Sequence, residues 1–523
     1  MLRGDLMQLI RLVFIALALC GPAFATTTPD ALREMVMAGD IAAVEAAISE
    51  AVEQDTATHA DPASQRDLFL VFQVTHPDIG AFTAKWLHDA PTSAYAMTAR
   101  AWYLYNLGFA NRGFDTMRST FSGGLDIMFE QHSEALSLFS AATEANPKLL
   151  AASDGILGAS RTVSAKENIP KELERIMALY PTRGSLMRVM FSVSPQWGGS
   201  REQVNLVCDR YAPKIVSIKD YTPEVCMVDA VFYADFRDEQ ARHTAYLALQ
   251  HLDQPILDDA RLAAAMDGRG PVEQRLEVFE KTKAKRPLTP EEVSRWRLVS
   301  DAANDLPRTH EDPTYAKAVA DNIDAMRRAA DQDPLNSIKV IDFIRQVGEL
   351  SSTNSTPYDR ADVEQRLQTL LRDVPHSWRA WQEYALFESL GPDYDLKKAN
   401  QFFQNSIFYS NYSREAVEEA LEYTSYMSNR RWHGIAKISN SAIAAPQLAE
   451  LDRLGLCPMV AFERLATELC RMENKSSVEC FSMDSFKSPR AELKEDIKAR
   501  GVCQTEANVP LETLLKGPVS VDF

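Results

Sequence analysis

The feature of this sequence that most constrains its fold is a helical spacing of apolar residues that ends repeatedly at a proline. Ala135, Phe139 and Ala142 place a small, a large and a small side chain on one helix face, and Pro147 follows. Proline cannot continue the hydrogen-bond ladder of a helix, so each such segment predicts a helix that stops just before it. The same offsets recur at Ile169, Leu173, Ile176 and Pro181, at Tyr211, Ile215, Ile218 and Pro223, at Asn322, Met326, Ala329 and Pro334, at Val363, Leu367, Leu370 and Pro375, and without the proline at Ala399, Phe403 and Ser406.

A second pattern indicates that these helices come in pairs. Residues 30–38 have the spacing of a short helix, Gly39 suits its left-handed C-terminal cap, and Asp40 suits the N-cap of the next helix. Apolar residues then return on one face, at Ile41, Val44, Ile48 and Val52. Strand-like alternation is scarce along the chain. We therefore expect two antiparallel helices joined by a tight turn to be the repeating unit.

The spacing of the units resembles that of a known repeat. Pro147 and Pro181 are 34 residues apart, which is close to the tetratricopeptide period of about 34 residues. Residues 381–385, with Trp, Tyr and Ala at the expected offsets, resemble the first helix of such a repeat, and the helix containing Ala399 and Phe403 resembles the second. The sequence thus predicts an all-α, tetratricopeptide-like α-solenoid of helix hairpins, closed by a disulfide-linked C-terminal cap.

The first 25 residues have the pattern of an export signal. Arg3 and Arg11 precede an apolar run over 12–19, which is too short to span a bilayer, and a small-x-small site ends at Ala25. We expect cleavage after Ala25 and a periplasmic or secreted protein. Lipidation at Cys20 and a retained anchor remain open alternatives. No later segment is long and apolar enough for a transmembrane helix.

The remaining chain is too long for one hydrophobic core, since single cores rarely exceed roughly 250–300 residues. Loop-forming residues cluster near position 305. We therefore expect an N-terminal helical-repeat domain over 26–304, a C-terminal one over 305–455 and a Cys-rich cap over 456–523.

Cysteine usage agrees with export, because six cysteines remain after the signal and disulfides form in oxidising compartments. Cys208 and Cys226 stand apart from the others, so we expect them to pair. The other four would form two bridges within the cap, with their pairing left open: Cys457, Cys470, Cys480 and Cys503. A zinc site is the weaker alternative, because no Cys-x-x-Cys is present and the cluster contains no histidine.

Charge and motifs exclude several functional classes. The chain carries 56 Lys and Arg against 73 Asp and Glu, a net charge of −17, which lacks the basic footprint of a nucleic-acid-binding protein. Metalloprotease, phosphate-loop, nucleophile-elbow and EF-hand motifs are absent from the sequence. The sequence gives no reason to expect a catalytic residue, a cofactor or a metal.

A run of short elements stands out between residues 70 and 215. They are Trp86, Pro91, Ser93 and Ala96, the aromatic helix Trp102-Tyr103-x-Tyr105, Arg112-Gly113 and Pro195-Gln-Trp-Gly-Gly-Ser200. In this order they resemble an uncharacterised bacterial family, a domain of unknown function with a tetratricopeptide-like core. The resemblance implies no established activity.

The same segment supplies the candidate binding residues. Aromatic and Arg side chains dominate binding hot spots, so we expect a partner-binding groove formed by Arg100, Trp102, Tyr105, Arg112 and Trp197. A structural role is the alternative. Trp197 could pack under a sharp turn at the two following glycines, with a capping box starting the next helix. Arg112 could stack on nearby rings.

We therefore expect an exported helical-repeat scaffold that binds a protein or peptide partner in the cell envelope. An extended concave surface can do this without any catalytic group. Two alternatives remain open: a cell-envelope enzyme with an unrecognised site on a helical scaffold, and an assembly factor that acts through its own oligomer interface.

Overall fold

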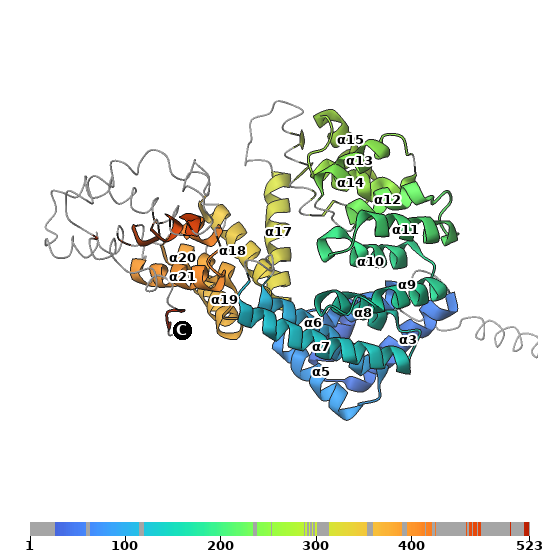
Figure 1. Ribbon diagram of the computed structural model, residues 1–523, viewed down its shortest axis with the longest axis horizontal. Coiled ribbons are helices and arrows are strands. Elements are labelled where there is room, and N and C mark those ends of the chain that lie inside the picture. The colour runs from blue at the N-terminus through green and yellow to red at the C-terminus, as the bar shows by residue number, and fades with distance from the viewer. Residues whose placement is uncertain are drawn as a thin grey trace, which may run out of the picture.

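The computed structural model describes most of the chain between residues 27 and 424. The described residues are 27–58, 63–113, 120–233, 238–252, 254–286, 313–352, 359–389 and 395–413, with short stretches within 288–300, 415–424, 457–471 and 503–521. Every element in these residues is a helix and none is a strand, which confirms the predicted all-α class (Figure 1). None of these helices is long and apolar enough to cross a membrane. The expected signal segment and the boundary near 305 lie outside the described residues.

In its first part, up to residue 286, the described chain contains fourteen α-helices and four short 3-10 helices. They are α2 (Pro29–Met37), α3 (Ile41–Thr58), α4 (Ala63–Phe69), η1 (Leu70–Phe72), α5 (Pro77–Asp89), α6 (Ala94–Arg112), α7 (Ser122–Ala145), α8 (Leu150–Thr162), α9 (Asn168–Leu179), α10 (Arg183–Val193), η3 (Pro195–Trp197), α11 (Arg201–Tyr211), η4 (Ala212–Lys214), α12 (Pro223–Tyr233), α13 (Glu239–Leu249), η5 (Pro255–Leu257), α14 (Asp258–Met266) and α15 (Val272–Lys285). The second half contributes α17 (Pro313–Gln332), α18 (Ser337–Ser352), α19 (Arg360–Asp373), α20 (Trp378–Ser389) and α21 (Leu396–Tyr409).

Successive helices pack against one another along the chain. The closest pairs are α6 with α7, α7 with α8, and α20 with α21. In Figure 1, α8 to α15 rise one after another from α6 and α7, and α17 stands between them and the group α18–α21. Asp333, just after α17, ties the two parts together: its Oδ1 accepts hydrogen bonds from the Thr75 backbone N–H at 2.8 Å and the Thr75 hydroxyl at 2.5 Å.

The first helix pair forms as the sequence predicts. Gly39 has a positive φ of 74°, so it provides the left-handed turn that ends α2. The Asp40 carboxylate accepts a hydrogen bond from the Ala43 backbone N–H at 3.0 Å, which satisfies one of the free amides at the start of α3.

Four of the five proline-terminated segments are helices that stop as expected. In each case the helix ends two residues before the proline: α7 before Pro147, α9 before Pro181, α17 before Pro334 and α19 before Pro375. The apolar triplets of α7, α9 and α19 are buried. In these four segments, where an uninterrupted helix precedes the proline, the helix stops just before it as predicted.

The segment before Pro223 was wrongly expected to be a helix. Helix α11 ends at Tyr211, and a 3-10 turn containing Pro213 follows. The ring of Pro213 cannot fit within a continuing helix, so Ile215 lies beyond the helix in a loop, although it is still buried. Pro223 starts α12 instead of ending a helix, because proline suits the first helical position.

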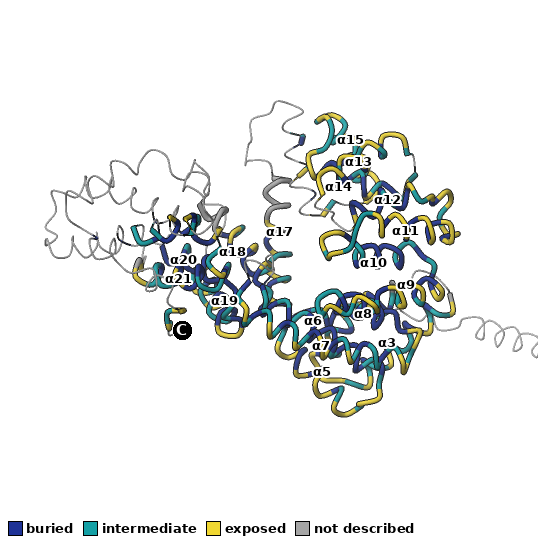
Figure 2. Tube along the Cα trace, in the orientation of Figure 1, coloured by how far each residue is buried: buried dark blue, intermediate teal, exposed yellow. Residues whose placement is uncertain are grey.

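Buried apolar side chains form three large clusters, with a smaller one around Phe279. One cluster joins α2–α8, a second runs from α8 to α14, and a third joins α17–α21 with Cys457, Phe462, Leu465, Ala466, Cys470 and Cys503. Figure 2 shows buried positions along the facing sides of neighbouring helices and exposed positions at many of the turns. The chain therefore spreads its core along the helix series. The expected domain limits remain predictions.

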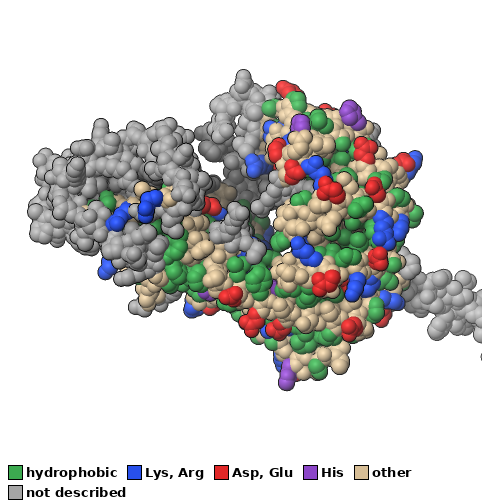
Figure 3. Space-filling model, viewed as in Figure 1, with side chains coloured by type: hydrophobic (Ala, Val, Ile, Leu, Met, Phe, Trp, Pro, Cys, Tyr) green, Lys and Arg blue, Asp and Glu red, His purple; other side chains and the backbone are tan. Residues whose placement is uncertain are grey.

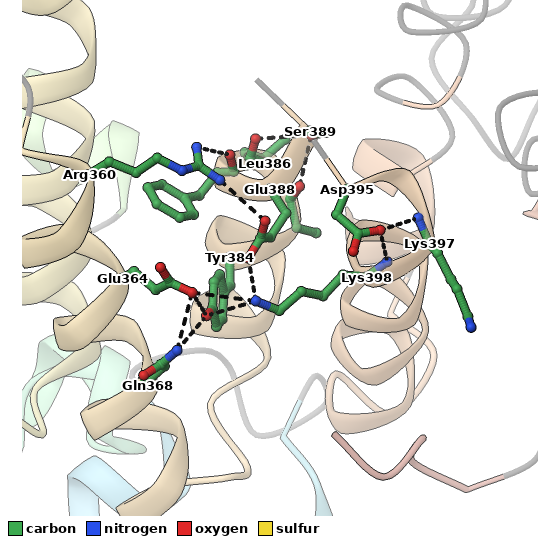
Figure 4. Close-up of polar contacts among 12 residues, drawn as sticks. Arg360, Glu364, Gln368, Tyr384, Leu386, Glu388, Ser389, Asp395, Lys397 and Lys398 are labelled. Carbon is green, nitrogen blue, oxygen red and sulfur yellow. Dashed lines mark hydrogen bonds and ion pairs between the residues drawn. The ribbon is translucent and has the colours of Figure 1, made fainter. Parts of the chain in front are cut away.

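The unit expected over α20 and α21 is a packed helix pair. The rings of Tyr384 and Phe402 stack at 4.3 Å. Polar side chains then fasten both helices to α19 (Figure 4). The Lys398 ammonium donates to Glu388 at 2.6 Å, and the Tyr384 hydroxyl donates to Glu364 at 3.1 Å. Arg360 reaches Glu388 from α19 at 3.3 Å. Since the buried Glu388 carboxylate has two cationic partners, the network satisfies its charge.

The disulfides agree with the sequence analysis where they are described. Cys208 and Cys226 form the expected bond, which joins α11 to α12. Cys457 and Cys503 form one of the two bridges expected in the C-terminal segment. Cys470 is also disulfide-bonded, and Cys480 lies outside the described residues.

Candidate binding pocket

The strongest candidate site is a pocket of about 330 Å³ that α6, α8, α10 and the η3 turn enclose. Each helix contributes residues three or four positions apart, which puts them on one face. Helix α6 contributes Trp102, Tyr105, Asn106 and Phe109; α8 contributes Asp154, Leu157, Gly158 and Arg161; α10 contributes Arg188, Phe191 and Ser192; Trp197 and Gln73 complete the lining. The intervening helices α7 and α9 contribute none of these side chains.

A rigid turn places Trp197 at the pocket. Gly198 has a φ of 75°, in the left-handed region, and it ends the 3-10 turn that carries Trp197. A Cβ on Gly199 would lie 1.9 Å from the carbonyl oxygen of Val193, so only glycine fits there. Ser200 and Gln203 form the expected capping box at the start of α11. The predicted sharp turn and capping box are thus confirmed.

Aromatic rings form the walls of the pocket. Trp102 and Tyr105 are almost fully buried and meet edge to face at 5.6 Å. Phe109 contacts Tyr105 at 5.0 Å and Trp197 at 6.4 Å, again edge to face. Phe191 lies 5.8 Å from Trp197 on the α10 side. Such edge-to-face pairs favour fixed positions for the rings of Trp102, Tyr105 and Phe109, so the wall that α6 provides is preorganised.

Arg161 is the central cation. Its guanidinium carbon lies 4.7 Å from the centre of the Phe191 ring and 4.5 Å from that of the Trp197 ring, so it makes a cation–π contact with each. Its Nη2 donates to the Tyr105 hydroxyl at 3.3 Å, but its buried Nη1 has no hydrogen-bond partner among the described residues. Within the same residues, the buried indole Nε1 of Trp197 has none either.

The charge of the pocket is positive. Asp154 is the only acid among its lining residues, and Arg66 neutralises it through a buried two-point ion pair at 2.7 and 3.2 Å. Arg161 and the exposed Arg188 have no carboxylate partner among the described residues. Acidic and basic side chains mix over the face of α8–α15 in Figure 3, so the surplus at the pocket is local.

A buried histidine supports the Tyr105 wall from behind. The His132 ring stacks on Tyr105 at 4.5 Å, and its Nε2–H donates to the Tyr105 carbonyl at 2.8 Å. Burial above all, with a smaller effect of the nearby Arg112 and Arg161 charges, lowers the pKa of His132 to about 4, although the hydrogen bond to Tyr105 opposes the shift. The ring is therefore neutral near pH 7. Gly108 leaves room for it, because an added Cβ would lie 2.5 Å from the imidazole.

Three of the five residues expected to form a groove line this pocket: Trp102, Tyr105 and Trp197. Arg100 belongs to another face of α6, where it donates to the Gly80 carbonyl at 3.3 Å and lies over Tyr103. Arg112 ends α6 and stacks on Phe109 at 5.8 Å, which is the structural alternative considered for it. Neither of these two arginines lines the pocket. The groove itself remains a prediction.

Sequence analysis missed Arg161, Arg188 and Phe191. Asp154, Leu157, Gly158 and Arg161 have the spacing of one helix face, and that signal is visible in the sequence. It does not reveal which face of α8 turns toward α6 and α10. Within the described residues, no group of three or more His, Cys, Asp or Glu side chains is placed to hold a metal ion.

No protein-family model and no curated protein matches this chain. The similarity of residues 70–215 to an uncharacterised bacterial family therefore stays a prediction.

Proposed function

We propose that this protein is an exported, tetratricopeptide-like helical-repeat scaffold that binds a protein or peptide partner in the cell envelope. The pocket between α6, α8 and α10 would hold part of that partner. The observation that carries the proposal is that Trp102, Tyr105 and Trp197, which the sequence analysis proposed as groove residues from their types, line one aromatic pocket. Aromatic anchors beside Arg are typical of binding hot spots.

The alternation of the lining helices supports a repeat scaffold. In a stack of helix hairpins, one helix of each pair faces the concave side and the other faces outward. Helices α6, α8 and α10 supply pocket residues, whereas α7 and α9 supply none. This is the pattern expected when the even-numbered helices form the inner surface.

The disulfides support export. Bonds such as Cys208–Cys226 and Cys457–Cys503 are typical of proteins from oxidising compartments, because cytosolic thiols are kept reduced. Together with the signal pattern of residues 1–25, they favour a periplasmic or secreted location.

Affinity capture tests the proposal. The full chain with a C-terminal tag is crosslinked in the cells that produce it and recovered from the envelope. We expect a partner to be recovered with the wild type and lost with Trp197→Ala. The matched control is Trp296→Ala, because Trp296 is also half-buried but lies outside the pocket. Equal recovery with both variants at unchanged helicity, or no partner with the wild type, would contradict the proposal.

A further inference from the structure

Two buried hydrogen-bond donors at the pocket have no acceptor in the part of the chain that the structure describes. They are Nη1 of Arg161 and Nε1 of Trp197. More than nine in ten buried polar groups in folded proteins have a partner, because an unpaired one destabilises the fold. Both donors belong to side chains that contact each other, so one acceptor group can serve both.

The charge around these donors identifies the acceptor as an anion. Arg161 and Arg188 have no carboxylate partner among the described residues, and Arg66 already neutralises Asp154. The chain as a whole carries a net charge of −17, so a pocket with surplus positive charge runs against its composition. A guanidinium fits a carboxylate well, since two parallel N–H groups meet two oxygens.

The walls identify what the anion is attached to. Besides the two arginines, the pocket presents the rings of Tyr105, Phe109 and Phe191 together with Leu157. An inorganic anion would leave these apolar surfaces without a contact. A carboxylate next to an apolar side chain uses both kinds of surface, because the side chain buries apolar area against the rings.

The size of the pocket favours a chain end. Its volume of about 330 Å³ lies near the lower limit of ligand pockets, about 300–1,000 Å³, so it suits one residue better than a passing chain. Only the C-terminal residue of a polypeptide carries a carboxylate and a side chain on the same carbon without further chain beyond it. Both unpaired donors are buried. The carboxylate therefore reaches them when the Trp197 side chain rotates. Among the rings that line the pocket, that of Trp197 is carried by a 3-10 turn and the others by helices.

We propose that this pocket binds the C-terminal residue of a partner polypeptide. The terminal carboxylate pairs with Arg161 and Arg188, and an apolar last side chain lies against the aromatic walls. This inference rests on the proposed function, since it names the part of the partner that the scaffold holds.

The test uses random octapeptides attached through their N-termini and made in two forms, with a free C-terminal carboxylate or a C-terminal amide. The full-length protein should bind free-acid peptides with an apolar last residue. For a labelled selected peptide, fluorescence anisotropy should show binding at least about tenfold weaker for the amide. Arg188→Gln should weaken binding of the free acid by a similar factor. Because Arg188 is exposed, this variant should fold normally.

Arg161→Gln provides the second variant, and Arg210→Gln is the matched control because Arg210 is an exposed arginine outside the pocket. We expect Arg161→Gln to weaken free-acid binding at least about tenfold and Arg210→Gln to leave it unchanged. Equal binding of acid and amide peptides, or binding that depends on an internal acidic residue, overturns the inference. If peptides bind in either of these two ways and Trp197→Ala abolishes their binding, the proposed function stands. Failure of every peptide in both forms overturns the inference and counts against the proposed function, which the crosslinked capture then decides.

Discussion

The guanidinium carbon of Arg161 lies 4.5 Å from the centre of the Trp197 ring. Arg161 belongs to the last turns of α8, and Trp197 follows α10 on a 3-10 turn. The Phe191 ring, whose centre is 5.8 Å from that of Trp197, lies 4.7 Å from the same guanidinium carbon. Trp197 belongs to a recognisable sequence motif, whereas Arg161 does not. The contact between them therefore helps to fix the position of Trp197.

The turn that holds Trp197 should not tolerate a side chain at Gly199. In Gly199→Ala the new Cβ would overlap the Val193 carbonyl, so the turn and Trp197 must move. We expect the free energy of unfolding to fall by about 1–3 kcal/mol and partner binding to fall at least about tenfold. Chemical denaturation and partner capture measure the two effects.

Gly39→Ala is the matched control, since Gly39 also lies in a turn after a helix but has open space around it. Its positive φ of 74° makes alanine cost roughly 1–2 kcal/mol. Partner binding should not change. If Gly199→Ala binds the partner like the wild type, the η3 turn does not position a binding residue.

His132 should make the protein less stable in mild acid. Its pKa is about 4 in the folded protein, against about 6.5 when unfolded. Between these values the unfolded chain binds a proton that the folded protein does not, so the free energy of unfolding falls as the pH drops from about 6.5 to about 4. The full effect is up to about 3 kcal/mol. Above pH 6.5 both forms are neutral and His132 adds no pH dependence.

Urea unfolding of the wild type and His132→Gln at several pH values between 4 and 7.5 measures this contribution. Glutamine keeps a donor for the Tyr105 carbonyl and does not titrate. The difference in unfolding free energy between the two proteins should change in the variant's favour as the pH falls. A difference that stays constant over this range would show that His132 protonates equally in both states.

The Cys208–Cys226 bond should stabilise the middle of the helix series. It closes a loop over a sequence separation of 18 residues and lies fully buried between α11 and α12. The double variant Cys208→Ala, Cys226→Ala should lose about 3 kcal/mol of unfolding free energy. Denaturation without reductant measures the loss. No change relative to the wild type would mean that the packing of α11 on α12 suffices without the bond.

The contact between Thr75, which follows η1, and Asp333, which follows α17, should add to the free energy of unfolding. Asp333 is buried, and removing it in Asp333→Ala leaves the Thr75 N–H and hydroxyl without their acceptor. We expect a loss of about 2–4 kcal/mol. Thr75→Val should remove the hydroxyl donor and destabilise, whereas Thr75→Ser, which keeps it, should stay near the wild type. Equal stability of Thr75→Val and Thr75→Ser would contradict a role for the hydroxyl.

Local chemistry explains what the sequence predicts correctly. The ends of α7, α9, α17 and α19 follow from proline stereochemistry, and the α2–α3 turn follows from Gly39 and Asp40. The helix predicted before Pro223 is absent because Pro213 restricts the backbone there, and this restriction outweighs the apolar spacing. Helix boundaries therefore depend on the strongest breaker nearby.

The candidate site depends on longer-range information. Residue type pointed to Trp102, Tyr105 and Trp197, which line the pocket. It also pointed to Arg100, which faces α5, and to Arg112, which ends α6, and neither of these lines the pocket. The arginine that completes the pocket comes from α8. The helical spacing of one segment cannot tell which of its faces meets a helix many residues away, so only the packed fold brings Arg161 and Trp197 together.

Site-specific photocrosslinking tests most directly whether the pocket holds the partner. A benzophenone amino acid is placed at Gln196, an exposed position next to Trp197, and separately at Leu247, which is half exposed on α13. Illumination of the producing cells should link the partner to the chain from position 196 and not from position 247. A partner linked equally from both positions, or only from position 247, would contradict binding at this pocket.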